Sequence, residues 1–135
     1  MTAKAKILLV DDDPDFLDMH RAVLANHGYE VITAASAREG MERVRTDMPD
    51  AIILDLMMEK HDAGFSFSRQ IKMDPLFKKI PILMVTSVAE ATGFRFSLQE
   101  DGYWMKTDDF LDKPVKPEVL LERVDRMLKK SREAP

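Results

Sequence analysis

Acidic, hydroxyl and basic side chains follow four short apolar runs of the chain, each close to the point where the run ends. In chain order, these residues are Asp11, Asp12, Asp13, Asp55, Thr86, Ser87 and Lys113. Carboxylates that gather in one place repel one another, so their ionised forms need a counter-charge. A hard divalent cation and an ammonium group supply that charge, and all-oxygen ligation with room for water suits Mg²⁺. The residue types therefore predict a magnesium site if the fold brings them together.

Each of these residues also has a simpler structural explanation when it is taken alone. Asp13 stands before Pro14 and is predicted to be a helix N-cap, which is the commoner role for an aspartate after a strand. Thr86 or Ser87 could equally cap the next helix, and a lone lysine such as Lys113 is usually a surface residue. The combination of residues, rather than any one of them, favours a functional site.

The elements that must position these residues follow from the alternation of short β-branched runs with longer helical patterns. Strands are predicted at Ile7–Val10, Tyr29–Thr33, Ala51–Leu54, Ile82–Val85 and Phe110–Leu111. Continuous apolar runs are typical of strands buried on both faces, and strands that alternate with helices indicate a parallel sheet. In such α/β folds, ligands bind beyond the carboxyl ends of the strands, near the point where the strand order reverses. The polar residues fall at these ends.

Capping residues mark the helices that are predicted between the strands. Asp13 and Pro14 open the first helix and Gly28 is predicted as its C-cap, while Ser36 and Glu39 have the spacing of a capping box. Further helices are predicted over about Phe65–Met73 and from Pro117. His20 and His27 fall in the first helix and are predicted to be surface or partly buried residues with no catalytic role.

The composition of the chain limits the classes of protein to which it can belong. The 135 residues suit one domain, and the apolar fraction of 45% with 33% charged residues is that of an ordinary globular protein. The absence of cysteine excludes disulfides and thiolate metal sites. A net charge of −4 with scattered basic residues argues against direct nucleic-acid binding. No apolar run approaches the ~18 residues of a membrane span, and the N-terminal run is too short for a signal peptide, so a cytoplasmic location is expected.

Four segments together resemble the motifs of a known family. They are Val10-Asp11-Asp12-Asp13-Pro14, Ile53-Leu54-Asp55-Leu56-Met57-Met58, Val85-Thr86-Ser87 and Asp112-Lys113-Pro114. In this order they are similar to bacterial response-regulator receiver domains of the two-component systems, of the chemotaxis-regulator kind, over about residues 6–130. The resemblance implies a flavodoxin-like (βα)5 doubly wound sheet of five parallel strands in the order 2-1-3-4-5. It implies one receiver domain over residues 1–135, with a core of about 5–130 and no output domain.

The resemblance also assigns roles at the phosphorylation site. Asp55 would be the nucleophile that accepts a phosphoryl group from a phosphohistidine of a sensor histidine kinase or a phosphotransfer protein. Mg²⁺ would be held by Asp11, Asp12, Asp55 and the backbone carbonyl of Met57. Because phosphoryl transfer proceeds through a loose transition state, such a site works by positioning and charge neutralisation.

The switch itself is assigned to three further residues. The Thr86 hydroxyl and the Lys113 ammonium would bind the phosphoryl oxygens, and Phe110 would change rotamer behind Thr86. The site would hydrolyse the aspartyl phosphate slowly, so the expected protein is a signalling module and not a turnover enzyme. Asp13 and Ser87 are expected to play secondary parts.

Two departures from the family pattern concern the loops. Glu59 stands where the family often has a proline, four residues after the phosphorylated aspartate, and this residue is a second-tier candidate for the site. The stretch between Thr86 and Lys113 is longer than is typical, which predicts an irregular insertion at about 88–108. Its aromatic residues are interpreted as folding back onto the domain, with a partner-docking surface as the alternative.

Several functional alternatives remain open. The chain could be a receiver cut from a larger regulator or a hybrid kinase, or a receiver-like scaffold that is not phosphorylated. A phosphatase of the haloacid-dehalogenase type would use Asp11 and Asp13 as its catalytic pair, but Asp55 would then have no role and such enzymes are larger. The expected partners are the kinase and a downstream protein target, with a homodimer possible and no membrane contact.

Overall fold

The protein is described by a computed structural model that covers residues 5–55, 63–87, 109–113 and 115–133. At some of these positions, Asp55, Thr86, Ser87, Phe110 and Lys113 among them, the description is of the backbone. The predicted insertion at about 88–108, together with Met57 and Glu59, lies outside the described residues.

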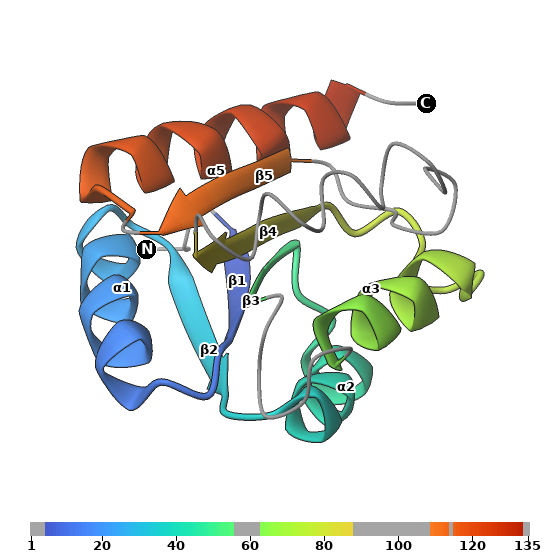
Figure 1. Cartoon of the computed structure of the whole chain (residues 1–135). Helices are drawn as coiled ribbons and strands as arrows, with labels where there is room; N and C mark the ends of the chain where they lie inside the picture. The colour runs from blue at the N-terminus through green and yellow to red at the C-terminus, as the bar shows by residue number, and fades with distance from the viewer. Residues whose placement is uncertain (1–4, 56–62, 88–108, 114, 134–135) are drawn as a thin grey trace.

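A five-stranded parallel sheet forms the centre of the molecule (Figure 1). The strands are β1 (Lys6–Val10), β2 (Glu30–Ala34), β3 (Ala51–Asp55), β4 (Ile82–Ser87) and β5 (Asp109–Lys113). They are arranged in the order β2-β1-β3-β4-β5, and every neighbouring pair is parallel. The order therefore reverses at β1, between β2 and β3. The predicted flavodoxin-like α/β fold and its strand order are confirmed.

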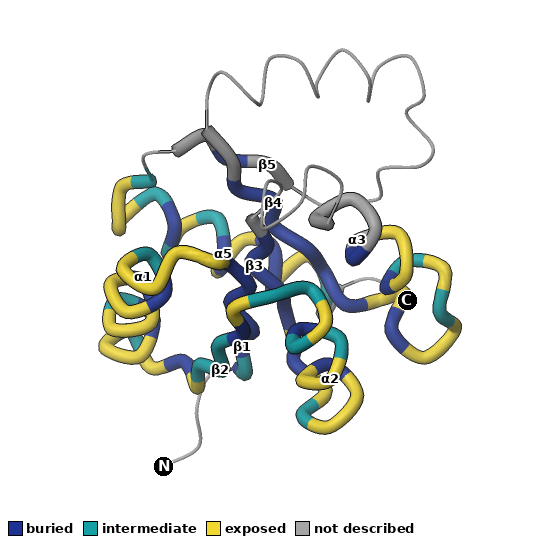
Figure 2. The backbone as a smooth tube through the Cα atoms, turned by 60° about the horizontal axis from the view of Figure 1, so that its bottom comes forward, coloured by how far each residue is buried: buried dark blue, intermediate teal, exposed yellow. Residues whose placement is uncertain are grey.

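Helices cover both faces of the sheet. The described helices are α1 (Pro14–Asn26), α2 (Ala37–Asp47), α3 (Ala63–Met73) and α5 (Pro117–Glu133). Side chains of α2 and α3 share one buried cluster with Leu8 and Val10 of β1, whereas those of α1 and α5 share the other with Ile7 and Leu9. Successive strand residues point to opposite faces, so one apolar run supplies both clusters. Figure 2 shows the resulting buried spine of strands.

The predicted caps are present at the helix ends. The Asp13 side chain accepts a hydrogen bond from the Asp15 amide at 3.0 Å and so caps α1, which begins at Pro14. The Ser36 hydroxyl accepts from the Glu39 amide at 3.1 Å. The Glu39 carboxylate accepts in turn from the amide of the residue before Ser36, at 2.6 Å.

Three sequence predictions about α1 and the start of β2 need correction. The C-cap of α1 is His27, and Gly28 is the following residue with a φ of 98°, a conformation that glycine adopts without a steric penalty. The second strand starts at Glu30 instead of Tyr29, because the Tyr29 amide still bonds to the Leu24 carbonyl at 3.1 Å.

The third correction concerns His20, which is buried with 1% of its surface exposed. It shares one face of α1 with Leu17 and Leu24, because residues three and four apart lie on the same side of a helix. Its Nδ1 atom lies 3.0 Å from the Phe16 carbonyl oxygen, and its ring stacks on Phe16 at a centroid distance of 4.0 Å. The residue type suggested exposure, but the helical position determines burial.

Candidate functional site

The ends of β1 and β3 bring two of the predicted site residues to adjacent positions. Val10 pairs with Leu54 in the parallel register, so Asp11 and Asp55 are the next residues of neighbouring strands. The Asp11 amide donates to the Ala34 carbonyl of β2 at 3.1 Å, which holds the chain in line just beyond β1. This position is the strand-order switch point, where open parallel sheets bind ligands. A backbone carbonyl such as that of Ala34 carries no sequence signal, so this contact could not be predicted.

Asp11 is one of the few charged residues in the described part of the chain that is buried. Only 1% of its surface is exposed, and its Oδ1 atom accepts a hydrogen bond from the Asp13 amide at 2.9 Å. A buried carboxylate is costly unless hydrogen bonds or a cation compensate it. The bond from Asp13 supplies part of this compensation and fixes the orientation of the carboxylate. Asp11 is therefore a preoriented hard oxygen donor at the end of β1.

Asp12 and Asp13 differ from Asp11 in exposure and in role. Both are exposed, and the Asp13 side chain is engaged as the N-cap of α1. The capping role that the sequence predicted for Asp13 is confirmed. Asp12 follows Asp11 directly at the same edge and faces water, which suits a cation that keeps part of its hydration shell.

The remaining predicted site residues lie at the same edge, at the ends of β4 and β5. Asp55 pairs with Val85, so Thr86 is one position further along the neighbouring strand. Ser87 pairs with Lys113 at the end of β5. These residues were predicted to follow their strands, but they belong to the strands, because the parallel pairing continues to their positions. The backbone thus places Asp55, Thr86 and Lys113 on three consecutive strands.

Phe110 lies further back along β5, where it pairs with Met84. The next residue, Leu111, is buried in the cluster that α1 and α5 cover. Met57 and Glu59 fall outside the described residues, as noted above. Among the side chains that the structure describes, which do not include that of Asp55, no group of three or more potential ligands is positioned to hold a metal.

The described helices carry no membrane span, since none of them is both long enough and apolar enough to cross a bilayer.

Comparison with known proteins identifies the family. The family model of the response regulator receiver domain matches residues 7–125. The chain is 32% identical over 127 residues to Protein PilH of Pseudomonas aeruginosa. The alignment covers 92% of this chain and 98% of PilH. It is 33% identical over 126 residues to the alkaline phosphatase synthesis transcriptional regulatory protein PhoP of Bacillus subtilis, but spans only 49% of that protein.

A solved structure is similar over nearly the whole chain. It is the signal receiver domain of a signal transduction histidine kinase from Syntrophus aciditrophicus, with a TM-score of 0.83 and 28% identity. The match covers 97% of this chain and 95% of that one. The fold of this chain is therefore shared with that receiver domain over nearly its whole length. The chain belongs to the response regulator receiver domain family.

Proposed function

We propose that this receiver domain of a two-component system is switched by phosphorylation of Asp55. The observation that carries the proposal is the pairing of β1 with β3, which sets the buried Asp11 beside Asp55 at the switch point of the sheet. A phosphoacceptor needs a nucleophilic oxygen with a charge-neutralising site next to it. The backbone register supports such an arrangement.

The covalent step transfers a phosphoryl group from a nitrogen atom to an oxygen atom. A carboxylate oxygen of Asp55 forms a bond to phosphorus, the P–N bond of a phosphohistidine breaks, and the imidazole leaves with the electron pair. The donor is a sensor histidine kinase or a phosphotransfer protein. Later attack by water on the phosphorus of the aspartyl phosphate breaks the bond to the Asp55 oxygen, releases inorganic phosphate and restores the carboxylate. The cycle resets the switch, so the chain acts as a signalling module.

The acidic residues support a Mg²⁺ requirement for this step. Asp11 and Asp12 supply hard oxygen donors, one buried and one exposed to water, and Asp55 and the Met57 carbonyl would complete the protein ligands. When bound, the ion would neutralise charge on the phosphoryl oxygens. The Asp13 amide contributes by holding the Asp11 carboxylate in one orientation.

The switch is assigned to residues at the ends of β4 and β5. A phosphoryl group adds negative charge and new acceptor oxygens, which the Thr86 hydroxyl and the Lys113 ammonium would bind. Phe110 would adjust behind them. Shifting the receiver from 1:99 to 99:1 between its two conformations takes about 5.5 kcal/mol of differential interaction. A few charge-assisted hydrogen bonds to the phosphoryl group can supply it.

A place within a longer regulator is the second candidate for the biological context. The coverage of 49% of PhoP favours it, since that relative is a transcriptional regulatory protein about twice as long as the matched segment. In that case the downstream target would be reached through another domain. If the receiver instead acts alone, the downstream target would be a separate protein that binds the phosphorylated receiver.

The proposal is tested by intact-mass spectrometry after incubation with acetyl phosphate, with and without Mg²⁺. One phosphate adduct is expected on the native chain with Mg²⁺, and none on Asp55→Ala. Asp50→Ala is a matched control, because Asp50 lies before β3 and its carboxylate bonds to the Lys6 amide. A folded native chain that gains no adduct from acetyl phosphate or from a histidine kinase would leave only the scaffold role.

A further inference from the structure

The end of α3 and the turn that follows it expose apolar side chains beside cations. We call this surface the α3 tip and define it as Arg69, Met73, Leu76, Lys78 and Lys79. Met73 is 69% exposed and Leu76 is 76% exposed, the highest values among the large hydrophobic residues that the structure describes. Figure 2 shows the exposed segment after α3 at the rim of the molecule. Such exposure has a cost, so it suggests a function.

The α3 tip is held in a fixed shape. Phe77 and Ile80 anchor the turn in the core, with 5% and 8% of their surfaces exposed. The Lys72 ammonium donates to the carbonyls of Lys78 at 3.3 Å and Ile80 at 2.7 Å. The Asp74 carboxylate accepts from the Leu76 amide at 2.8 Å. Met73 and Leu76 are thus presented on a preorganised turn, which lowers the entropic cost of binding.

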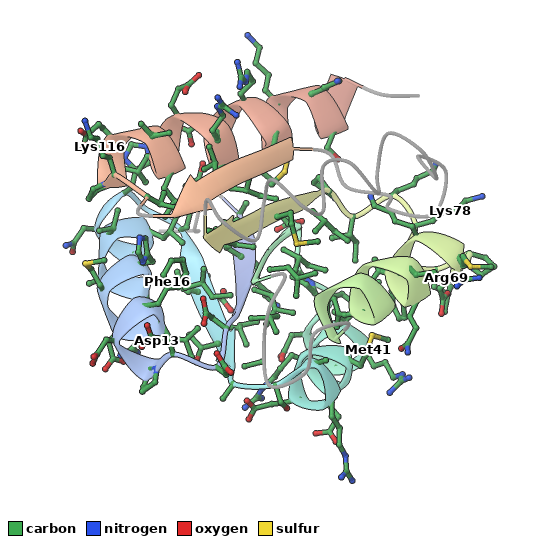
Figure 3. All side chains as sticks on the ribbon, in the orientation of Figure 1. Asp13, Phe16, Met41, Arg69, Lys78 and Lys116 are labelled. Carbon is green, nitrogen blue, oxygen red and sulfur yellow. The ribbon has the colours of Figure 1, made fainter. Side chains whose placement is uncertain are left out.

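The charge of the α3 tip is opposite to that of the whole chain. The chain carries a net charge of −4, whereas the stretch 69–79 holds four basic residues and one acidic residue, Asp74. Arg69, Lys78 and Lys79 are exposed, and Figure 3 shows Arg69 and Lys78 at the end of the molecule that carries α3. The complementary surface is therefore anionic, with an apolar group that can cover Met73 and Leu76.

We propose that the α3 tip docks an acidic segment of a partner protein in which an aliphatic side chain stands among the carboxylates. Arginine and methionine are enriched in the cores of protein interfaces, and lysines suit the rim. The surface lies away from the carboxyl ends of the strands, beside the turn that leads into β4. The proposal therefore does not depend on phosphorylation of Asp55.

The other anionic occupants fit this surface less well. Met73 and Leu76 offer about eight apolar side-chain atoms, fewer than a single myristoyl chain, which alone gives only marginal membrane binding. On a second copy, the exposed hydrophobic residue with an acidic neighbour on α1 is Met19, which is 53% exposed, but the neighbouring Asp18 carboxylate already lies 3.9 Å from the Arg21 guanidinium. A contact between two different patches closes only as a reciprocal two-fold pair or as a ring, and otherwise produces open chains of molecules.

The test is an NMR titration of the full ¹⁵N-labelled chain with a synthetic helical peptide that has glutamates around a leucine stripe. We expect amide shifts centred on residues 69–79. The affinity should fall about tenfold when the ionic strength rises from about 0.02 M to about 0.2 M. The same peptide with glutamine in place of glutamate should bind about tenfold more weakly.

Variants of the α3 tip sharpen the test. The double variant Lys78→Glu/Lys79→Glu and, separately, Leu76→Ser should each lose about tenfold or more in affinity. The matched control is Lys116→Glu, which reverses an exposed lysine before α5 and should bind as the native chain does. If circular dichroism shows that Leu76→Ser does not fold, the double variant Lys78→Glu/Lys79→Glu alone serves as the test.

Three results would overturn the proposal. The first is a set of amide shifts centred away from residues 69–79. The second is equal peptide affinity in the native chain and the charge variant. The third is binding of the α3 tip to vesicles of about 70% phosphatidylcholine and about 30% phosphatidylglycerol, a membrane-like composition chosen for its anionic lipid. Such binding, when the peptide does not bind, would assign the surface to lipid.

Discussion

The two ends of the sheet use aspartate in opposite ways. At the amino end, the Asp50 carboxylate accepts from the Lys6 amide at 2.7 Å, and the Asp125 carboxylate accepts from the Tyr29 hydroxyl. Each of these carboxylates has its own donor and joins segments far apart in the chain. At the carboxyl end, the backbones of Asp11 and Asp55 lie at neighbouring positions, Asp11 directly after β1 and Asp55 at the end of β3.

We infer that position in the fold, rather than residue type, distinguishes the structural carboxylates from those proposed to be reactive. A carboxylate that joins two distant segments through its own donor stabilises the fold. The Asp11 carboxylate also accepts from a nearby amide, that of Asp13, but its backbone lies next to that of a second aspartate, Asp55. Carboxylates at adjacent strand ends repel each other and therefore favour a cation or a reaction that removes charge. The parallel topology creates the second situation at one end of the sheet, where the strand order reverses.

The largest effect is expected at Asp11. The change Asp11→Asn removes a negative charge from the carboxyl end but keeps the shape and the acceptor for the Asp13 amide. The Mg²⁺ concentration that half-saturates phosphorylation should rise by at least about 10–100-fold, which is the loss typical even for outer-shell partners of a metal. Phosphorylation rates over a Mg²⁺ titration measure this effect.

Asp50→Asn is the matched change at the amino end and should leave the Mg²⁺ requirement unchanged. An equal shift in both variants would contradict the distinction between the two ends of the sheet.

The next effect concerns the packing beneath the carboxyl end. A Cβ atom on Gly40 would lie 2.8 Å from Cε2 of Phe67 and 3.2 Å from Cγ2 of Val10, the residue before Asp11. Gly40→Leu should cost about 1–3 kcal/mol in the free energy of unfolding through overpacking, offset by about 1 kcal/mol of helix propensity. Urea unfolding gives this value.

The same variant should also weaken Mg²⁺ binding, because Val10 must move. Ala25→Leu, at an exposed position of α1, is the control and should be close to neutral in both measurements. A Gly40→Leu variant that gains the full ~1 kcal/mol of helix propensity would show that α2 and α3 are not in close contact here.

A smaller effect is expected at the amino end. Asp125→Asn weakens the acceptor that α5 offers to the Tyr29 hydroxyl and to His27, whose Nε2 atom lies 3.2 Å from Asp125 Oδ2. The free energy of unfolding should fall by about 1 kcal/mol, the usual worth of a partly exposed hydrogen bond. Thermal unfolding would detect the change, while acetyl phosphate should still label the variant at the native rate. A reduced rate would mean that this end of the sheet also contributes to the site.

The smallest effect is a gain in stability at the end of α2. Met48 is the C-cap of α2 and has a φ of 47°, a left-handed conformation that costs energy for any residue with a side chain. Met48→Gly should raise the free energy of unfolding by about 0.5–1 kcal/mol, because strain relief exceeds the added entropy of the unfolded chain. Met19→Gly, in the middle of α1, should lose about 1 kcal/mol. A loss of stability in Met48→Gly would show that the cap is not strained.

Much of the fold could be predicted from local patterns. The apolar runs located the strands, and Asp13 and Ser36 marked two helix starts, because these signals act within a few residues. The strand ends were placed too early at Thr86 and Lys113, since parallel pairing continues through polar residues that interrupt an apolar run. The burial of His20 was missed because its helical position outweighs its residue type.

The sequence proposes the members of the site but not its geometry. The order of the motifs selects Asp11, Asp55, Thr86 and Lys113, and the register confirms that their backbones reach one edge of the sheet. The nearly complete burial of Asp11 and its bond from the Asp13 amide depend on the turn between β1 and α1 and on Ala34 of β2. The bond from the Asp13 amide is a local contact of a kind that aspartate commonly makes two residues along the chain. The burial of Asp11 arises from tertiary contacts and leaves no pattern in the sequence.

Asp55 is proposed to be the phosphoacceptor, and locating the phosphoryl group on the labelled chain tests this assignment. After incubation with acetyl phosphate and Mg²⁺, hydroxylamine converts an aspartyl phosphate to a hydroxamate, which peptide fragmentation assigns to one residue. The account predicts a hydroxamate at Asp55 that requires Mg²⁺ during labelling. A hydroxamate at another carboxylate, such as Asp12 or Asp50, would contradict it.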